Sequence, residues 1–246
     1  MALHSIFTRK IGVTIAISFL SLILLMIMPL VTSAEESNEI EKNEQTDAQE
    51  ILSNPDSYIN YLENYSEEDA INAGVDTSYI NEAVEDAREQ AEKFKKLTTD
   101  EQKEILDMMK SPDVFEQSSQ IISEEDPIGG ISLLASQRTI SHTSTLRLLG
   151  IDWTKYKVTG VYNYNSKGAT STKSTKGIVV RNLNPMVQTS NTSNQGLVSK
   201  GIYTGTSTFN YKIGPLKGLS VQIGTYNIQV KGNHKGKTSG KGWTSS

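Results

Sequence analysis

Cysteine is absent from this sequence of 246 residues. Its absence excludes disulfide bonds, thiolate metal ligands and a cysteine nucleophile. Small extracellular domains usually rely on disulfides for stability. If the chain is exported, we therefore expect a Gram-positive bacterium as its source.

Histidines are few, and carboxylate side chains are rare in the C-terminal half of the chain. Of three histidines, His4 lies in the N-terminal segment, and His142 and His234 are far apart, with no metal-ligand spacing. A structural or catalytic zinc ion usually needs three or four protein ligands. Asp152 is the only carboxylate side chain after Asp126, so a Ser-His-Asp triad would need Asp152 and one of many serines, a match of little specificity. We predict no catalytic residues, no metal, no cofactor and no enzymatic activity.

The first 34 residues have the three parts of a secretory signal peptide. Arg9 and Lys10 supply a basic start, residues 11–28 carry no charge, and Pro29 precedes small residues that end at Ala34. This layout predicts export and cleavage after Ala34. An uncleaved anchor is the alternative, because the apolar run is nearly long enough to span a bilayer.

Charge divides the remaining chain into two halves of opposite sign. Residues 35–128 contain 27 acidic and 7 basic side chains, whereas residues 129–246 contain 1 acidic and 15 basic side chains. Such a division indicates two segments with different partners. Opposite charges on one chain also attract each other at low ionic strength, so we expect the acidic half to be one partner of the basic half.

The acidic half is predicted to be helical after a polar start. Residues 35–50 have little apolar content and are expected to form a disordered acidic lead. Residues 51–124 form the predicted acidic helical region, a possible propeptide. Asn54 and Pro55 are typical of a helix start. A longer helix is expected from Asp76, with an apolar stripe made of Ile80, Val84, Ala87, Ala91 and Phe94.

Two further helix starts follow in the acidic half. Thr98 and Glu101 fit a capping box. Ser111 and Pro112 predict a last short helix that continues through Ile121. Many carboxylates lie opposite the apolar stripes, where solvation explains them better than the paired acid and base of a glycosidase.

Residues 125–138 form the predicted linker. They join acidic residues to a proline and to Gly129 and Gly130, and the sign of the charge changes here. This composition is typical of an exposed domain boundary and of a protease site. We predict a processing region that includes Gly129, Gly130 and Arg138.

The basic half alternates apolar and polar residues with a period of two. Residues 139–232 are therefore predicted to form a cationic antiparallel β domain, a sandwich or a small barrel. Turns are expected at 165–168, 182–185, 191–196 and 214–218, and a bulge at Gly224, where the alternation changes phase. The fold class is thus α+β in two segments, a small acidic helical region followed by an antiparallel all-β domain.

Lysines in the basic half are candidates for binding polyanions. Residues 233–246 are predicted to be a flexible tail rich in lysine and glycine that carries Trp243. Flexible lysines beside an aromatic side chain suit anionic polymers or anionic membrane surfaces. The candidate binding residues are Lys155, Lys157, Lys212, Lys231, Lys235, Lys237 and Lys241.

Two functions agree with these features. The first is a secreted bacterial proprotein whose acidic helices are removed, which frees a bacteriocin-like cationic β domain to act on anionic envelope surfaces without catalysis. The second is an intact, wall-associated protein that binds teichoic-acid-like polymers. Nucleic acid would bind the same charges, but export makes it an unexpected physiological partner. An enzyme that uses scattered polar residues is the third alternative.

Overall fold

The computed structural model describes residues 48–123, 136–214 and 222–245. All of them belong to one compact unit, Glu44–Ser246. The predicted signal peptide, most of the predicted acidic lead, and Gly129 and Gly130 lie outside the described residues.

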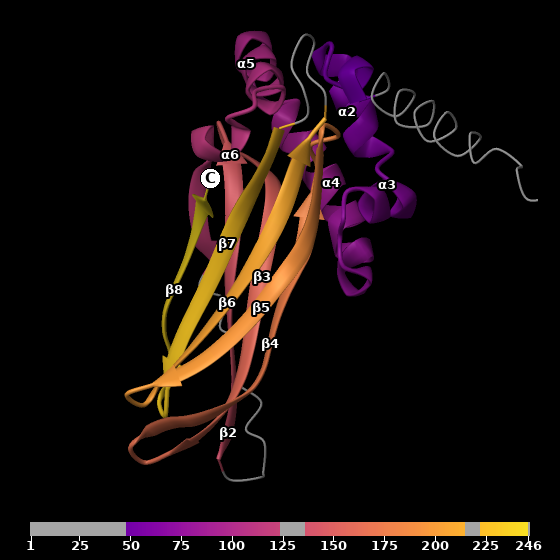
Figure 1. The fold of residues 1–246 in the computed structure, drawn as a ribbon. Helices are drawn as coiled ribbons and strands as arrows, with labels where there is room; N and C mark the ends of the chain where they lie inside the picture. Colours follow the sequence, from indigo (N-terminus) through magenta and orange to yellow (C-terminus); the bar gives the residue numbers. More distant parts are fainter. Residues whose placement is uncertain (1–47, 124–135, 215–221, 246) are drawn as a thin grey trace, which may run out of the picture. The chain divides into compact units, whose positions relative to one another are not determined.

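Short helices follow one another in the acidic half (Figure 1). Their bounds are α2 Pro55–Glu63, α3 Glu67–Asn72, the 3₁₀ helix η1 Thr77–Tyr79, α4 Ile80–Phe94, α5 Thr99–Met109 and α6 Val114–Gln117. Two predicted starts are confirmed: Asn54 caps α2 through a bond from the Ser57 backbone, and Thr98 and Glu101 form the capping box of α5.

The last predicted helix is shorter than expected. Helix α6 ends at Gln117, and Ser119–Ser123 form strand β1, which pairs with the strand that begins at Gln137. The prediction of helix through Ile121 is therefore wrong. Pairing with a distant strand decides the conformation of this segment, and local sequence carries no signal of that pairing.

Together with β1, the remaining strands make up two antiparallel sheets of four strands each (Figure 1). The strands are β2 Gln137–Leu148, β3 Ile151–Asn165, β4 Gly168–Asn182, β5 Val187–Ser199, β6 Ile202–Ile213, β7 Gln222–Asn233 and β8 Gly236–Ser245. Sheet A has the order β1-β2-β3-β4 and sheet B the order β5-β6-β7-β8, so each sheet is a meander. The predicted antiparallel β structure is confirmed, and it is not a closed barrel.

Two predictions in the basic half need correction. Residues 191–196, predicted as a turn, lie inside β5 and pair with β6. The predicted flexible tail at 233–246 contains β8, which pairs with β7 from Asn233↔Gly236 to Thr225↔Ser245. Polar residues and glycines obscure the period of two in both segments, because neither carries an alternating apolar series.

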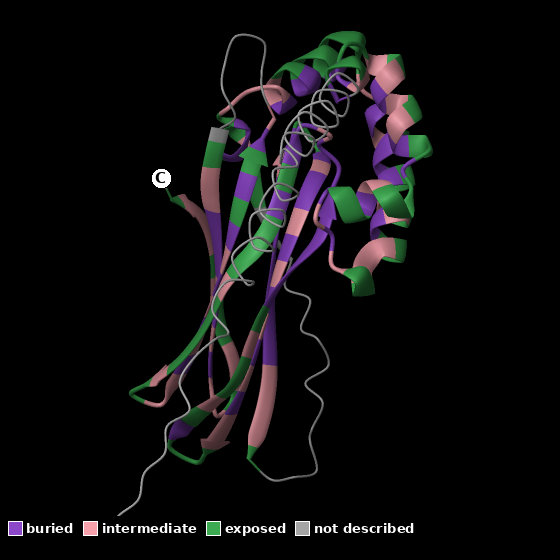
Figure 2. Cartoon of the chain, turned by 45° about the vertical axis from the view of Figure 1, so that its right-hand side comes forward, coloured by how far each residue is buried: buried purple, intermediate pink, exposed green. Residues whose placement is uncertain are grey.

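Glycines on one sheet make room for rings on the other. A Cβ at Gly160 in β3 would lie 2.3 Å from Tyr203 Cε1 in β6, and one at Gly240 in β8 would lie 2.2 Å from His142 Cγ in β2. Contacts of this closeness cannot be made by a residue with a Cβ. The two sheets therefore face each other, with glycines set against aromatic side chains. Buried residues, coloured purple, recur along the strands (Figure 2).

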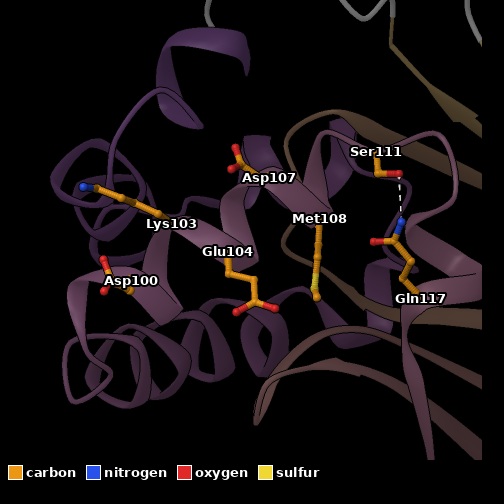
Figure 3. Close-up of a pocket in the computed structure, with 7 residues that line it drawn as sticks. All are labelled: Asp100, Lys103, Glu104, Asp107, Met108, Ser111 and Gln117. Atoms are coloured by element: carbon orange, nitrogen blue, oxygen red, sulfur yellow. Dashed lines mark hydrogen bonds between the residues drawn. The ribbon is translucent and has the colours of Figure 1, made fainter.

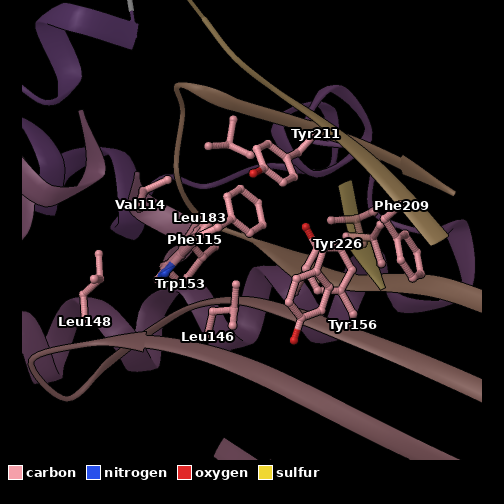
Figure 4. Packing of buried hydrophobic residues seen from close by; sticks show 14 of the residues in the cluster. Val114, Phe115, Leu146, Leu148, Trp153, Tyr156, Leu183, Phe209, Tyr211 and Tyr226 are labelled. Carbon is pink, nitrogen blue, oxygen red and sulfur yellow. The ribbon is translucent and has the colours of Figure 1, made fainter. Parts of the chain in front are cut away.

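Aromatic side chains from both sheets and from α6 fill one continuous core (Figure 4). Tyr156 of β3 stacks on Tyr226 of β7, with ring centroids 4.8 Å apart. Phe115 of α6 stacks on Tyr211 of β6 at 3.7 Å and meets Trp153 of β3 edge-on at 5.2 Å. The helical segment thus contributes a ring to the space between the sheets.

Polar contacts also join the helices to the strands. The Tyr58 and Tyr65 hydroxyls in the helical segment donate to the Leu183 and Asn182 carbonyls, at 3.2 and 2.9 Å. All four residues are buried. Because the bonds satisfy backbone carbonyls that would otherwise lack partners away from water, the helices are part of the folded unit.

Candidate functional site

Acidic side chains of the helical segment meet the cations of sheet A. Lys155 of β3 pairs with Glu82 of α4 at 3.0 Å, and Lys176 of β4 pairs with Asp76 at 3.1 Å. The Ser78 hydroxyl and the neighbouring Lys176 lower the pKa of Asp76, which keeps this carboxylate charged. Lys155 and Lys176 of sheet A therefore already have carboxylate partners within the chain.

Lys157 is the second predicted binding residue that lies against the helical segment. Its ammonium donates to the Tyr79 hydroxyl at 3.0 Å and lies 5.5 Å from the ring centroid of Tyr79. Of the seven predicted lysines, Lys155 and Lys157 therefore already have partners on the helices, and a polyanion would have to compete with those partners.

The other five predicted lysines belong to sheet B and its β7–β8 turn. Lys212 is on β6, Lys231 is on β7, Lys235 is in the turn after β7, and Lys237 and Lys241 are on β8. Within residues 48–123, 136–214 and 222–245, none of the five is within ion-pair distance of a carboxylate. The sequence has no acidic residue after Asp152, so sheet B presents positive charge without internal neutralisation.

The outer face of sheet B is a polar surface with one aromatic ring. Lys241 holds its ammonium 4.3 Å from the ring centroid of Trp243, a cation–π contact. Beside them, Thr208 donates to the Asn227 side chain at 2.8 Å, and Asn227 donates to the Ser245 hydroxyl at 3.0 Å. These bonds run across β6, β7 and β8 and hold the face in one arrangement.

Sequence reasoning missed Lys173, which is exposed on β4 without a carboxylate partner among the described residues, and two further lysines of this kind, Lys167 and Lys200. Both are exposed in hairpin turns and lack a carboxylate partner in the described part of the chain. The sequence did contain a signal for Lys167, because the string Asn-x-Lys-Gly that includes the predicted Lys235 at 233–236 also occurs at 165–168.

The predicted processing residues are only partly described. Gly129 and Gly130 fall outside the described residues. Arg138 lies in β2, where its guanidinium donates to the His234 carbonyl at 3.1 Å and lies 4.9 Å from the ring centroid of Tyr164. These contacts tie the side chain of Arg138 to the β7–β8 turn.

The residues of a possible Ser-His-Asp triad lie in different surroundings. Asp152 is held by Arg147 and lies 3.8 Å from Arg181. His142 is 1 % exposed between the sheets, and neither ring nitrogen has a hydrogen-bond partner among the described residues. Burial, with a smaller contribution from Lys237, lowers the pKa of His142 to about 4. Asp152 therefore pairs with Arg147 and Arg181, and among the described residues it makes no hydrogen bond to His142.

A hollow of about 560 Å³ lies on α5 (Figure 3). It is lined by Asp100, Lys103, Glu104, Asp107, Met108, Ser111 and Gln117. Charged side chains along one helix dominate this lining, and Met108 is its only large apolar side chain. We assign no ligand to it. In the described ranges, no three or more histidine, aspartate or glutamate side chains gather as a metal site would require.

Among the residues that the structure describes, no helix is both long and apolar enough to cross a bilayer. Comparison of the chain with protein-family models, with curated proteins and with solved structures gave no match.

Proposed function

We propose that the chain is exported, that it stays intact after removal of its signal peptide, and that it binds anionic polymers of a bacterial envelope through the lysines of sheet B. The observation that carries the proposal is the sorting of cations. Lys155, Lys176 and Arg181 on sheet A meet carboxylates, whereas Lys212 and Lys241 on sheet B meet none among the described residues.

Electrostatics explains why this sorting matters for binding. A lysine already paired with a carboxylate gives up that partner when it binds an external anion, so its net contribution is small. A lysine without a partner contributes its full attraction, and near an anionic surface each such side chain is worth about 1 kcal/mol. The binding energy of the proposed complex therefore comes from sheet B.

Buried contacts favour an intact protein over a proprotein that loses its helices. Removal of the helical segment would expose Trp153 and Tyr211, which pack on Phe115. It would also leave the buried Leu183 carbonyl without its partner Tyr58 and separate Arg181 from Asp86. Each of these losses is costly, so we place the helices in the functional form.

A polymer fits the outer face of sheet B better than a membrane. The exposed apolar residues on this face are Leu197 and Ile223, at 65% and 69% exposure. Their pairing partners on β6 are Thr204 and Lys212, which places them about 26 Å apart at roughly 3.3 Å per residue. Between them the face is polar, so no continuous apolar patch is available to enter a bilayer.

Sedimentation with purified Gram-positive cell walls tests the proposal. The chain from Glu35 onward is mixed with walls at low and high salt, and with walls from which the anionic polymers have been removed chemically. We expect retention at low salt, release as salt rises, and little retention on stripped walls. Equal retention on native and stripped walls, or no retention at low salt, would overturn the proposal.

A further inference from the structure

Three hairpin turns at one end of the two sheets each place a lysine before a glycine (Figure 1). The pairs are Lys167-Gly168, Lys200-Gly201 and Lys235-Gly236, in the turns β3–β4, β5–β6 and β7–β8. The three glycines have φ of +142°, +75° and +128°, a region that residues with a Cβ rarely adopt. All three lysines are exposed.

Two of these turns share a fixed local geometry. In the β3–β4 turn, the Asn165 side chain accepts a bond from the Lys167 backbone N–H at 2.8 Å. In the β7–β8 turn, the Asn233 side chain accepts the same bond from Lys235 at 2.7 Å. The repeated Asn-x-Lys-Gly string therefore encodes a repeated turn that holds the lysine at the tip of a hairpin.

Hydrogen bonds join two of the turns directly and tie the third to strands β2 and β3. The Ala169 N–H donates to the Gly201 carbonyl at 2.8 Å, which connects the β3–β4 turn to the β5–β6 turn. Tyr162 of β3 donates to the Asn233 carbonyl at 2.7 Å. The guanidinium of Arg138 reaches the same β7–β8 turn. We call Arg138, Lys167, Lys200 and Lys235 the hairpin-tip cluster.

The hairpin-tip cluster lacks internal anions. No carboxylate of the described ranges pairs with any of its four side chains. Two nitrogens at this end, Arg138 Nε and His234 Nδ1, are buried without a hydrogen-bond partner among the described residues. The exposed positive charge of Lys167, Lys200 and Lys235 is therefore open to an external anion.

We propose that the hairpin-tip cluster is a phosphate-binding site. A phosphate monoester carries more negative charge than a carboxylate and has three acceptor oxygens that can meet several donors at once. Lysines from separate turns suit such a compact, multiply charged group, since each acts as a point charge. The source of the phosphate rests on the proposed function: we take it to be a phosphate monoester group carried by an envelope polymer.

Titration with a small anion can distinguish binding at this site from binding to the rest of sheet B. Pyrophosphate is titrated into the chain from Glu35 onward, with amide shifts observed by NMR, and succinate serves as the carboxylate probe. We expect pyrophosphate to shift the amides of the three turns. The triple variant Lys167→Ala, Lys200→Ala, Lys235→Ala should weaken pyrophosphate binding at least about tenfold, on the basis of about 1 kcal/mol per lysine.

A matched control has the same change in net charge. The variant Lys212→Ala, Lys231→Ala, Lys241→Ala should bind pyrophosphate within about twofold of the wild-type affinity, because those lysines are too widely spread to share one small anion. Equal losses in the two triple variants, or binding of succinate as tight as that of pyrophosphate, would overturn the site. Circular dichroism checks that each variant is folded.

Failure of this site is distinguishable from failure of the proposed function. If native walls retain the chain and the tip variant still binds pyrophosphate normally, the phosphate site is wrong and wall binding stands. If pyrophosphate binds at the turns but walls do not retain the chain, the site stands and its assignment to an envelope polymer is wrong.

Discussion

Arg181 of β4 and Asp86 of α4 form an ion pair in which the arginine side chain is only 4% exposed. The pair lies between an acidic helix and the cationic sheet, and Asp152 approaches the same guanidinium at 3.8 Å. A buried charge is tolerated only where a partner compensates for its lost hydration. The contacts between the acidic half and the basic half of the chain thus include one buried ion pair.

Asp86→Ala should lower the free energy of unfolding by about 3 kcal/mol, because it leaves Arg181 buried without its nearest partner. Urea denaturation followed by circular dichroism measures the change. Glu85→Ala is the matched control, since Glu85 is exposed on the same helix and its loss changes the net charge equally; we expect an effect within about 0.5 kcal/mol. Similar effects of the two substitutions would contradict the assigned role of the pair.

Phe115→Ala tests whether the helical segment shares the core of the sheets. Phe115 is 3% exposed and stacks on Tyr211, so its truncation should cost about 3–5 kcal/mol. Glu116→Ala, at the exposed neighbouring position, should leave stability nearly unchanged. Thermal unfolding monitored by tryptophan fluorescence reports the result, and a loss below about 1 kcal/mol in Phe115→Ala would show that the ring is dispensable.

Gly240→Ala tests the packing of glycine against His142. The added Cβ would lie 2.2 Å from His142 Cγ, so the sheets must move apart or the ring must shift. Overpacking of this kind costs about 1–3 kcal/mol. Ser239→Ala, at the exposed neighbouring position on β8, serves as the control. Equal stability of the two variants in urea denaturation would mean that the sheets are less tightly packed than described.

Stability should fall as the pH is lowered, in part because of His142. Its pKa is about 4 in the folded chain against an ordinary 6.5, so between these values the unfolded chain binds more protons, and the stabilisation is fully present only above about pH 6.5. The contribution lost between pH 7 and pH 4 is about 3 kcal/mol. Lys237 is the charged group that contributes to the lowered pKa.

His142→Phe separates this contribution from those of the carboxylates. Phenylalanine keeps a ring opposite Gly240 but cannot be protonated. Carboxylates with lowered pKa, such as Asp76 and Glu89, lose their stabilisation at low pH in both proteins. The difference between the wild-type and variant curves of unfolding free energy against pH therefore isolates His142. Parallel curves from pH 7 to pH 4 would show that His142 does not titrate as described.

Local features of the sequence predicted much of the local structure. Asn54 and Thr98 marked helix starts because capping is decided within four residues. The alternation of Tyr156, Val158 and Tyr162 predicted which face of β3 is buried. These signals are short-range, so they can be recognised without knowledge of the fold.

Long-range contacts could not be predicted in the same way. Gly224 changes the phase of the apolar alternation, yet β7 has no register shift at this position in its pairing with β6; the glycine instead faces the Tyr211 ring. Likewise, nothing near Lys155 in the sequence indicates Glu82 as its partner. The division of the lysines into paired and unpaired groups follows from tertiary packing alone.

The central claim is that Lys155, Lys157 and Lys176 on sheet A already have partners on the helical segment, whereas Lys212, Lys231 and Lys241 on sheet B have no carboxylate partner among the described residues. The most direct test measures wall binding at low salt for Lys155→Ala, Lys157→Ala, Lys176→Ala and for Lys212→Ala, Lys231→Ala, Lys241→Ala, two triple variants with equal loss of charge. We predict wall affinity within about twofold of wild type for the sheet A variant and at least about tenfold weaker for the sheet B variant. Equal weakening, or greater weakening in the sheet A variant, would contradict the claim.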